Sequence, residues 1–361
     1  MFGSSAASWS EMSAQAQQDL VQGLGYVIDD RYLLHDTGRR HPESPQRLIA
    51  INEVLASLAD ALVWQPLTPR LASLDELELI HDASHIRRVE YAARCAPSYL
   101  DQDTPVSSES YQTALLAAGG VLESVDAVCS GRMKRVFAFV RPPGHHAHAG
   151  DSKGFCVFNN VALAAAYAIH KHKLERVAIA DFDVHHGDGT QSCFYSTPDV
   201  LYISSHQFPF YPGTGDFNEI GNGKGRGLTV NFPLPEGTGD PVFIPIYSKL
   251  VSAILDQFVP QLILVSAGFD GHFRDPLGGL TLTHSGYRSA AASLMLAAER
   301  YCQGRICFVL EGGYNLEALK ACSRSIMDAM EQHPPEVASV REGSAFTEIA
   351  KRTARLGHWK L

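Results

Sequence analysis

The sequence predicts an α/β fold, a single domain in which a central, mostly parallel sheet is covered by helices on both faces. Apolar segments typical of strands alternate along the chain with segments of helical periodicity, which is the order found in parallel, doubly wound sheets. The strand segments lack polar alternation, as expected for strands that are buried on both faces. No internal repeat or boundary divides the chain, so one folded domain is expected over residues 23–361.

The expected elements follow one another in a regular order. Strands are expected at 25–28, 135–140, 176–182, 200–205, 228–232, 261–267 and 305–310. Helices are expected at 48–58, 109–129, 159–171, 241–257, 284–302 and 315–330.

Two segments stand apart from this alternation. Residues 1–22 are polar and rich in Ser, Ala and Gln, and we expect them to form a mobile or loosely docked extension. Residues 207–227 are rich in glycine but also carry aromatic side chains. The segment is too long for a simple linker, so it is expected to form a rim beside a functional site.

The composition is that of an ordinary soluble globular protein, with 361 residues, of which 45% are hydrophobic and 19% charged. No apolar run approaches the roughly 20 residues that span a bilayer, and no basic region followed by an apolar stretch begins the chain. A membrane span and a secretory signal are therefore not expected. The net charge of −9 argues against a nucleic-acid surface and mildly favours cationic partners.

The cysteines suggest a reducing compartment, so a cytoplasmic protein is expected. They number seven, form no CxxC pair, and several lie inside apolar segments. An odd number of buried free thiols fits neither a disulfide framework nor a thiolate metal site. They stand at positions 95, 129, 156, 193, 302, 307 and 322.

The most informative segment is residues 181–190, which directly follow a buried strand. Asp181, Asp183 and His185 occupy alternate positions, and alternate side chains of an extended strand share one face. Carboxylate and imidazole are ligands that Zn²⁺ accepts. A solvated acidic turn is the alternative, but it does not explain why Phe182 and Val184 between these residues are apolar. The pattern therefore favours a metal site.

Three other strands are also followed by polar residues suited to chemistry. His145 and His146 follow the strand at 135–140, beyond a Pro-Pro-Gly turn in which both rings can face one pocket. Asp270 and Tyr314 follow the strands at 261–267 and 305–310. Open α/β sheets build their sites at the carboxyl ends of their strands, so these residues are expected to meet.

This arrangement suggests a role for each residue. Asp183, His185 and Asp270 are the expected metal ligands, with an open position for water and substrate. Tyr314 is expected to donate a hydrogen bond to a developing oxyanion, although a half-buried aromatic residue with a satisfied hydroxyl is the alternative.

His145 and His146 are candidates for proton transfer, oriented by Asp181 and Asp188. Other histidines lack such neighbours and are interpreted as surface or packing residues. They are His148, His170, His172 and His284.

With these motifs in one order, the chain resembles the zinc-dependent histone deacetylases of the arginase–deacetylase superfamily, including bacterial histone-deacetylase-like amidohydrolases. The resemblance runs from about residue 25 to residue 315. Its motifs are HPESPQRL at 41–48, RPPGHHA at 141–147, GFCVFNN at 154–160, DFDVHHGDGT at 181–190, PGTGD at 212–216, SAGFD at 266–270 and EGGYN at 311–315.

The resemblance implies an arginase-like fold, a catalytic domain over 23–361, and hydrolysis of an N-acetyl amide to amine and acetate. It implies that Asp183, His185 and Asp270 bind zinc. It also implies that His146, paired with Asp188, is the general base for water. By the same comparison His145, paired with Asp181, is the electrostatic partner or acid for the leaving amine. Tyr314 matches the tyrosine that stabilises the transition state.

Further residues match the substrate tunnel of the family. Phe155, next to Gly154 in the same motif, and Tyr211 match its two aromatic walls, where the family usually has phenylalanine at the second position. Asp103 matches a rim aspartate that binds the substrate backbone, with Asp101 as the rival match. Arg47 matches an arginine near an inner acetate-release cavity.

A structural potassium ion is also implied by the resemblance. Its expected ligand residues are Asp181, Asp183, His185, Ser204 and Ser205.

Four functions are candidates for a chain with these residues. The first is an acyl-lysine deacetylase acting on proteins, peptides or similar small acylated amines, and the second is an acetylpolyamine deacetylase. Polyamine-selective relatives place a glutamate where this chain has Leu277, which favours the first. Arginase chemistry needs further carboxylates on the metal strand, and a catalytically silent binding module would not need every chemical residue intact. The sequence leaves open the choice of Zn²⁺ or Fe²⁺, the physiological substrate and the oligomeric state.

Overall fold

The computed structural model describes residues 23–57 and 63–361, and all statements below concern these residues. The predicted extension at 1–22 lies outside them. An eight-stranded sheet forms the centre, with strand order β2-β1-β5-β10-β9-β6-β7-β8, and every neighbouring pair is parallel. Its strands are β1 (Leu24–Val27), β2 (Trp64–Leu67), β5 (Arg135–Ala138), β6 (Val177–Asp181), β7 (Val200–Gln207), β8 (Thr229–Leu234), β9 (Leu262–Ala267) and β10 (Ile306–Leu310). The predicted fold class is confirmed.

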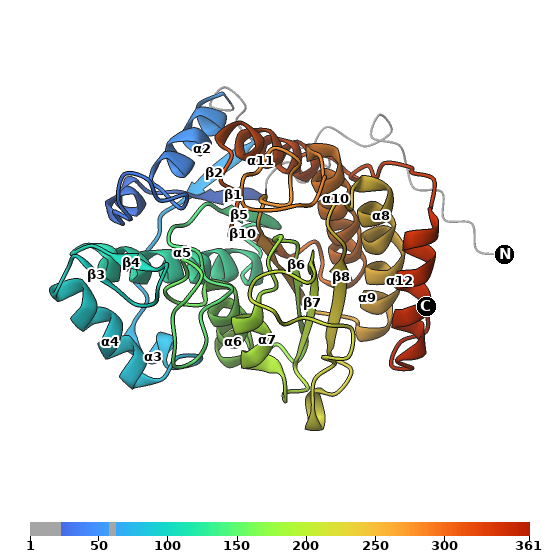
Figure 1. Cartoon of the computed structure of the whole chain (residues 1–361), viewed down its shortest axis with the longest axis horizontal. Helices are drawn as coiled ribbons and strands as arrows, with labels where there is room; N and C mark the ends of the chain where they lie inside the picture. The colour runs from blue at the N-terminus through green and yellow to red at the C-terminus, as the bar shows by residue number, and fades with distance from the viewer. Residues whose placement is uncertain (1–22, 58–62) are drawn as a thin grey trace.

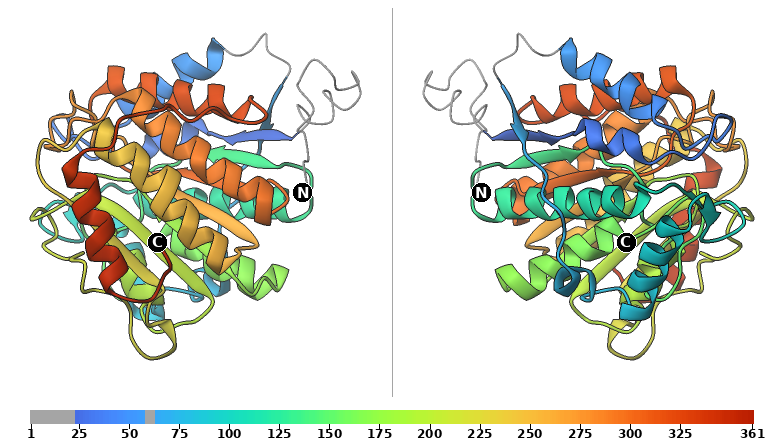
Figure 2. Two further views of the ribbon diagram at one scale, coloured as in Figure 1. Left: turned by 90° about the vertical axis from the view of Figure 1, so that its right-hand side faces the viewer. Right: turned by 90° about the vertical axis from the view of Figure 1, so that its left-hand side faces the viewer.

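Helices cover both faces of the sheet, as Figures 1 and 2 show. One layer contains α5 (Ser110–Cys129) and α6 (Asn160–His172), and α7 (Asp188–Phe194) extends it. The other contains α2 (Gln46–Ala56), α8 (Asp240–Pro245), η4 (Ile246–Val251), α9 (Ser252–Phe258), α10 (His284–Tyr301) and α11 (Leu316–Met330). The remaining elements are η2 (Asp30–Leu34), α3 (Leu74–Leu77), α4 (Ala83–Arg94), a two-stranded ribbon of β3 (Ser98–Tyr99) and β4 (Pro105–Val106), η3 (Gly223–Gly225) and α12 (Ser344–Arg355).

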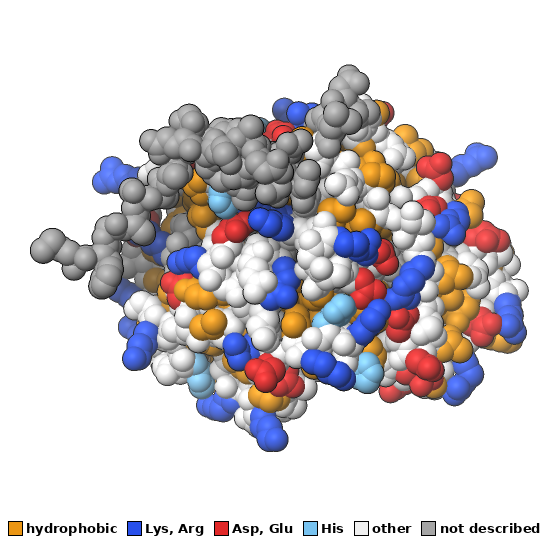
Figure 3. Space-filling model, turned by 180° about the vertical axis from the view of Figure 1, so that it is seen from behind, with side chains coloured by type: hydrophobic (Ala, Val, Ile, Leu, Met, Phe, Trp, Pro, Cys, Tyr) orange, Lys and Arg blue, Asp and Glu red, His pale blue; other side chains and the backbone are white. Residues whose placement is uncertain are grey.

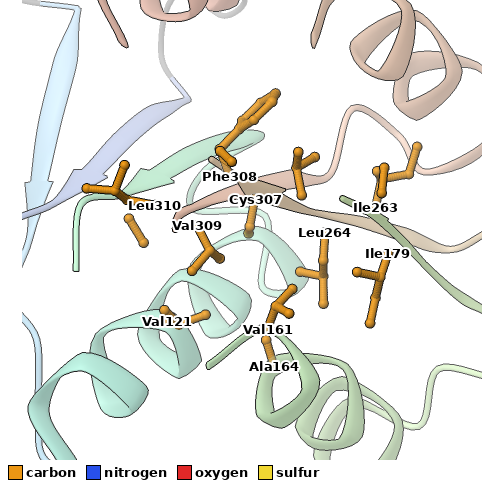
Figure 4. Close-up of a cluster of buried hydrophobic side chains, with 14 of the residues drawn as sticks. Val121, Val161, Ala164, Ile179, Ile263, Leu264, Cys307, Phe308, Val309 and Leu310 are labelled. Carbon is orange, nitrogen blue, oxygen red and sulfur yellow. The ribbon is translucent and has the colours of Figure 1, made fainter. Parts of the chain in front are cut away.

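The core fills the space between the sheet and its helices. Figure 4 shows Val121 of α5 and Val161 of α6 facing strand side chains such as Ile179 and Leu264, all of them fully buried. Burying one such side chain contributes about 1.5–3 kcal/mol. Strands β5, β6, β9 and β10 are buried at every position, which explains why their sequences carry no polar alternation.

All seven predicted strands and all six predicted helices are present, with small shifts at their ends, and one helix differs in kind. Residues 241–257 do not form one regular helix, because Pro245 lies inside it and a π-helical turn, η4, follows. Proline has no N–H to donate, so the regular hydrogen-bond ladder is interrupted there. Strand β2 and helices α4, α7 and α12 were not predicted.

On the side shown in Figure 3, acidic and basic side chains are interspersed among apolar ones.

All seven cysteines are free, and four of them are buried. Within the described residues, no helix combines the length and the apolar character needed to cross a bilayer.

Candidate active site

The carboxyl ends of four central strands meet at one edge of the sheet and surround a cavity of about 130 Å³. Strand β6 leads into Asp183 and His185, β9 into Asp270, and β10 into Tyr314, while His145 and His146 follow β5. The predicted convergence at this edge is therefore observed. The cavity is lined by Asp103, Pro143, His145, His146, Gly154, Phe155, Cys156, His185, Tyr211, Leu277, Gly312 and Tyr314.

Asp183, His185 and Asp270 form a compact group beside this cavity, which His185 lines. One ligand atom from each lies within 4.8 Å of the others. Nδ1 of His185 is 3.1 Å from Oδ1 of Asp183 and 3.2 Å from Oδ2 of Asp270. The contact with Asp270 lacks hydrogen-bond geometry, so this fully buried oxygen has no hydrogen-bond partner among the described residues. Two buried carboxylates, one with an unsatisfied oxygen, fit a divalent cation.

Two glycines make room for these carboxylates. A Cβ atom on Gly268 would lie 1.9 Å from Oδ2 of Asp183, and one on Gly312 would lie 2.1 Å from Oδ2 of Asp270. The backbone also holds the acids in place, because Gly312 N donates to Asp183 at 2.8 Å and Val184 N donates to Asp270 at 2.9 Å. Larger residues at either glycine would displace the carboxylates.

The charges of this group are unbalanced without a cation. Burial, followed by the charge of Asp183, raises the pKa of Asp270 to about 7. Burial opposes ionisation of Asp183 as well, but His145 and His185 together hold its pKa below the usual value. Burial opposes protonation of His185, but its close contacts with the two carboxylates outweigh this and raise its pKa to about 10. A bound divalent cation would neutralise the excess negative charge instead.

Two histidine–aspartate pairs lie beside the metal group. Nδ1 of His145 is 3.1 Å from Oδ2 of Asp181, and Nδ1 of His146 is 2.9 Å from Oδ1 of Asp188. Burial, followed by the charge of His145, lowers the pKa of His146 to about 3. Although burial opposes it, the charges of Asp183 and Asp181 hold the pKa of His145 well above its usual value. The two imidazoles therefore have opposite protonation preferences, as an acid and a base require.

Tyr314 is fixed by its neighbours on both sides. Asn315 caps α11 through a bond from Ala318 N, and Tyr314 N donates to Oδ2 of Asp275 at 2.6 Å. The guanidinium of Arg47 lies 5.1 Å from the centre of the Tyr314 ring, and its Nε donates to Gly313 O at 2.7 Å. Burial, followed by the charge of Asp270, raises the pKa of Tyr314. Its hydroxyl is thus protonated at neutral pH and can donate a hydrogen bond.

Phe155 and Tyr211 form opposite parts of the cavity wall. Phe155 packs edge-on against Tyr314, with ring centres 5.8 Å apart, and Tyr211 packs edge-on against His146 at 5.1 Å. Gly154 has φ +57, and a Cβ there would lie 2.5 Å from Cδ2 of His146, so glycine is required. Leu277 also lines the cavity.

Of the two rival rim aspartates, the structure places only Asp103 on the cavity. Its Oδ1 accepts a hydrogen bond from Gly154 N at 3.1 Å. Arg47 lies behind Tyr314, fully buried, and does not line the cavity. These positions agree with the sequence-based matches, while the roles remain predictions.

The expected potassium residues include Asp183 and His185 of the metal group, and the other three lie on the neighbouring strands β6 and β7. Asp181 pairs with Ser204 in the sheet register, and Tyr247 connects Ser205 to the Asp181 carbonyl, with its hydroxyl 2.8 Å from Ser205 Oγ and 3.3 Å from that carbonyl oxygen. Ser204 Oγ lies 2.9 Å from Nδ1 of His206. Potassium binding itself stays a prediction.

His148 is 28% exposed, but the expectation that it lacks a carboxylate neighbour is wrong. Its Nε2 lies 2.9 Å from Oδ2 of Asp188, and Lys153 contacts the same oxygen. His170 and His284 are exposed, as expected, and His172 pairs with Asp126 on the surface.

Sequence reasoning also missed Glu311. This fully buried carboxylate accepts bonds from Gly144 N at 2.7 Å and His145 N at 3.2 Å, so it anchors the turn that carries both histidines. Burial raises its pKa to about 7. Its position at the end of a buried strand, directly before two glycines, was the available signal.

Comparisons with known proteins agree with this geometry. The family model described as the histone deacetylase domain matches residues 41–330. A probable deacetylase of Archaeoglobus fulgidus is 40% identical over 309 residues, covering 85% of this chain and 86% of the relative. A histone deacetylase-like amidohydrolase of Pseudomonas aeruginosa is 37% identical over 292 residues, covering 80% and 76%.

A solved structure is similar over nearly the whole chain. The crystal structure of the HDA15 HD domain superposes with a TM-score of 0.85 at 33% identity, covering 93% of this chain and 94% of that one. Because the family model matches well over half of the residues and the relatives align along most of their length, the chain belongs to the histone deacetylase family.

Proposed function

We propose that this protein is a zinc-dependent deacylase that removes acetyl or other short acyl groups from lysine side chains or similar amines. Membership of the histone deacetylase family supports a hydrolase of the deacetylase type. The observation that carries the finer proposal is the group of Asp183, His185 and Asp270. One of its members, His185, lines the same cavity as His145, His146 and Tyr314.

Asp183, His185 and Asp270 would hold the Zn²⁺ ion, with Fe²⁺ as the other candidate for this ligand set. When bound, the ion supplies Lewis-acid polarisation of the acyl carbonyl and lowers the pKa of water. The remaining chemistry belongs to the side chains of this chain.

His146 acts as the general base in this proposal. Its Nδ1–H donates to Asp188, which leaves the Nε2 lone pair directed away from the carboxylate, and its low pKa keeps it unprotonated at neutral pH. His145, whose pKa is raised, serves as the electrostatic partner and proton donor for the leaving amine. Asp181 holds that ring and stabilises its charge.

Tyr314 donates a hydrogen bond to the oxyanion that forms when water attacks the acyl carbon. Two buried carboxylates offset much of the charge of a divalent ion, so a separate donor is needed for this oxygen. Arg47 fixes the segment carrying Tyr314 through its bond to Gly313 and its position below the ring.

The cavity suits an extended alkyl chain that carries a terminal acyl amide. Phe155 and Tyr211 supply aromatic walls, Gly154 lets the backbone approach closely, and Asp103 offers an acceptor for substrate N–H groups. Leu277 lines the cavity with an apolar side chain, and by the resemblance it stands where polyamine-selective relatives have a glutamate. A lysine side chain is therefore the favoured substrate, with acetylpolyamines as the alternative.

A structural potassium ion is part of the same proposal, held near Asp181, Asp183 and His185 with Ser204 and Ser205. The buried connection from Ser205 through Tyr247 to the Asp181 carbonyl supports this proposal, because it gathers several oxygen atoms beside Asp181.

The test is acetate release from an acetyl-lysine peptide, measured beside N-acetylputrescine and N-acetylspermidine, with and without a chelator. Chelator-sensitive turnover of the peptide, with little turnover of the polyamines, is expected. A preference for the polyamines would keep the metal site and overturn the substrate assignment. Turnover that survives complete removal of metal would overturn the mechanism.

A further inference from the structure

Asp188 uses its two carboxylate oxygens for different partners. Oδ1 faces Nδ1 of His146 at 2.9 Å, on the side of the catalytic cavity. Oδ2 faces the other way, where Nε2 of His148 lies 2.9 Å away and Lys153 forms an ion pair with it. The side chain of Asp188 is 7% exposed, while those of His148 and Lys153 are 28% and 25% exposed. The two outer residues therefore cover the carboxylate on its solvent side.

The other pair, His145 with Asp181, needs no residues of this kind, because Asp181 does not face solvent. Oδ2 of Asp181 accepts from the Tyr202 hydroxyl at 3.1 Å as well as from His145, and the residue is fully buried. Asp188, in contrast, lies between the catalytic cavity and a surface cavity of about 400 Å³ that it lines together with His148. Without His148 and Lys153, water from that side could bond Oδ2 and let the carboxylate turn.

The fold fixes these residues relative to one another. Residues 148 and 151, and residues 153 and 156, form isolated bridges, so the chain doubles back between them. Asp188 begins α7, and a Cβ on the next residue, Gly189, would lie 2.4 Å from the Ala147 carbonyl oxygen. Asn159 also donates to that oxygen at 3.0 Å. The turn that carries His146 and His148 is thus packed directly against the start of α7.

We propose that His148 and Lys153 are positioning residues for catalysis: together they bind Oδ2 of Asp188 and keep Oδ1 directed at Nδ1 of His146. This inference rests on the proposed function, because it acts through the general base. A carboxylate held in this way fixes one tautomer of His146, with the Nε2 lone pair available to water. Lys153 also balances the charge of Asp188, so the anion is stable in a largely buried position.

The same three residue types occur elsewhere without a catalytic neighbour, which provides a matched control. Asp126 accepts from Nε2 of His172 at 2.7 Å and from Nζ of Lys171 at 3.1 Å. This trio lies at the ends of α5 and α6, away from the catalytic cavity. If histidine and lysine only add a surface ion pair, both trios should respond alike to substitution.

The experiment compares Lys153→Met, His148→Gln and the double variant with Lys153→Arg, and with the control variants Lys171→Met and His172→Gln. Steady-state kinetics on the acetyl-lysine peptide and thermal unfolding are measured for each zinc-loaded protein. For Lys153→Met we expect kcat to fall about tenfold or more, with KM changed by less than about twofold, because only orientation of the base is lost. Lys153→Arg should recover most of this loss, and the control variants should keep the wild-type kcat.

Wild-type kcat in both Lys153→Met and His148→Gln, with an active wild-type protein, would overturn the inference and leave the proposed function intact. Equal losses in the catalytic and control trios would overturn it too, since the effect would then be structural. A wild-type protein without turnover on any acylated amine would overturn the proposed function, and this inference with it.

Discussion

Two buried clusters of charge differ in how they are neutralised. In the first, Glu43 accepts from Nε of Arg141 at 2.5 Å and from Arg47 at 3.2 Å, and all three side chains are fully buried. The remaining donors of Arg141 reach the carbonyls of Tyr32 and His35, both at 3.0 Å. Burial opposes ionisation, but Arg141 and then Arg47 lower the pKa of Glu43 to about 2. The carboxylate of Glu43 therefore has its counter-charges within the chain and needs no bound ion.

The second cluster, Asp183 with His185 and Asp270, has two acids and no arginine or lysine, and the only positive charge within it is a proton that His185 can release. One oxygen of Asp270 lacks a hydrogen-bond partner among the described residues, and the pKa of that residue is raised to about 7. The difference teaches that burial of charge alone does not mark a functional site. An acid that two arginines of its own chain hold supports structure, whereas two acids that share only an exchangeable proton are suited to bind a cation.

The Glu43 cluster is connected to the active site through Arg47, so it can affect catalysis as well as stability. Arg47 bonds Glu43 and also donates to the carbonyls of Glu311 and Gly313, in the segment directly before Tyr314. The first cluster therefore fixes the position of the tyrosine that faces the second.

The largest effect is expected from Asp183→Asn, which removes one charge from the incomplete cluster. Loss of zinc binding should lower kcat/KM by about 10³-fold or more, because Lewis-acid and water activation are worth several kcal/mol. The companion variant Asp270→Asn should not cost the metal-free protein stability, because burial and the charge of Asp183 raise the pKa of Asp270 and the amide removes that repulsion. Peptide kinetics, metal content and denaturant unfolding check these outcomes. Normal metal content with normal activity would exclude this aspartate as a ligand.

Glu43→Gln should have the opposite pattern, with a large loss of stability. Two buried guanidinium groups would lose their counter-charge, at a cost of about 3–5 kcal/mol in the free energy of unfolding. The matched control is Glu123→Gln, whose partner Arg132 is 52% exposed and whose removal should cost less than about 1 kcal/mol. Urea unfolding measures both. Equal small losses would show that the buried cluster contributes little.

Tyr314→Phe removes only the hydroxyl of the tyrosine that the Glu43 cluster holds beside the metal group. We expect kcat to fall about 10²–10³-fold while KM changes little, because the hydroxyl donates chiefly to the transition state. Zinc content and unfolding temperature should match those of the wild type. A rise in KM at constant kcat would instead assign the hydroxyl to substrate binding.

The smallest effect is a dependence of stability on pH that comes from neutral buried histidines. Burial lowers the pKa of His35 to about 4, of His81 to about 3 and of His85 to about 4. The unfolded chain protonates these residues near pH 6.5, so below that value it binds more protons than the folded chain. Stability should be at its full value above about pH 6.5 and should fall as the pH drops towards 4.

Urea unfolding at several pH values would measure this slope. His81→Gln should make the slope smaller, since one of the titrating groups is gone. A stability that stays constant between pH 6.5 and pH 4 would show that these histidines are protonated in the folded protein.

Much of the fold could be predicted because its central strands are apolar at every position and alternate with amphipathic helices. Strand β2 escaped prediction because it is short, half exposed and contains Pro66, and α7 because only seven residues form it. The break at Pro245 needed the structure, since helical periodicity continues across it.

The metal group could be predicted because Asp183 and His185 stand at alternate positions of one segment, and Asp270 follows another buried strand. The partners of Asp188 could not, because His148 and Lys153 reach it only through the geometry of the turn at 148–156. The Glu43 cluster joins residues 98 positions apart, a distance at which local patterns hold no information.

The most direct test of the account is a zinc titration of metal-stripped protein, followed by acetate release from an acetyl-lysine peptide. The account predicts no turnover at the start, then a linear rise that ends at a single equivalent of Zn²⁺, and no rise in Asp183→Asn or Asp270→Asn. Full turnover before zinc is added, or an identical rise in both variants, would contradict the assignment of this cluster as the catalytic metal site.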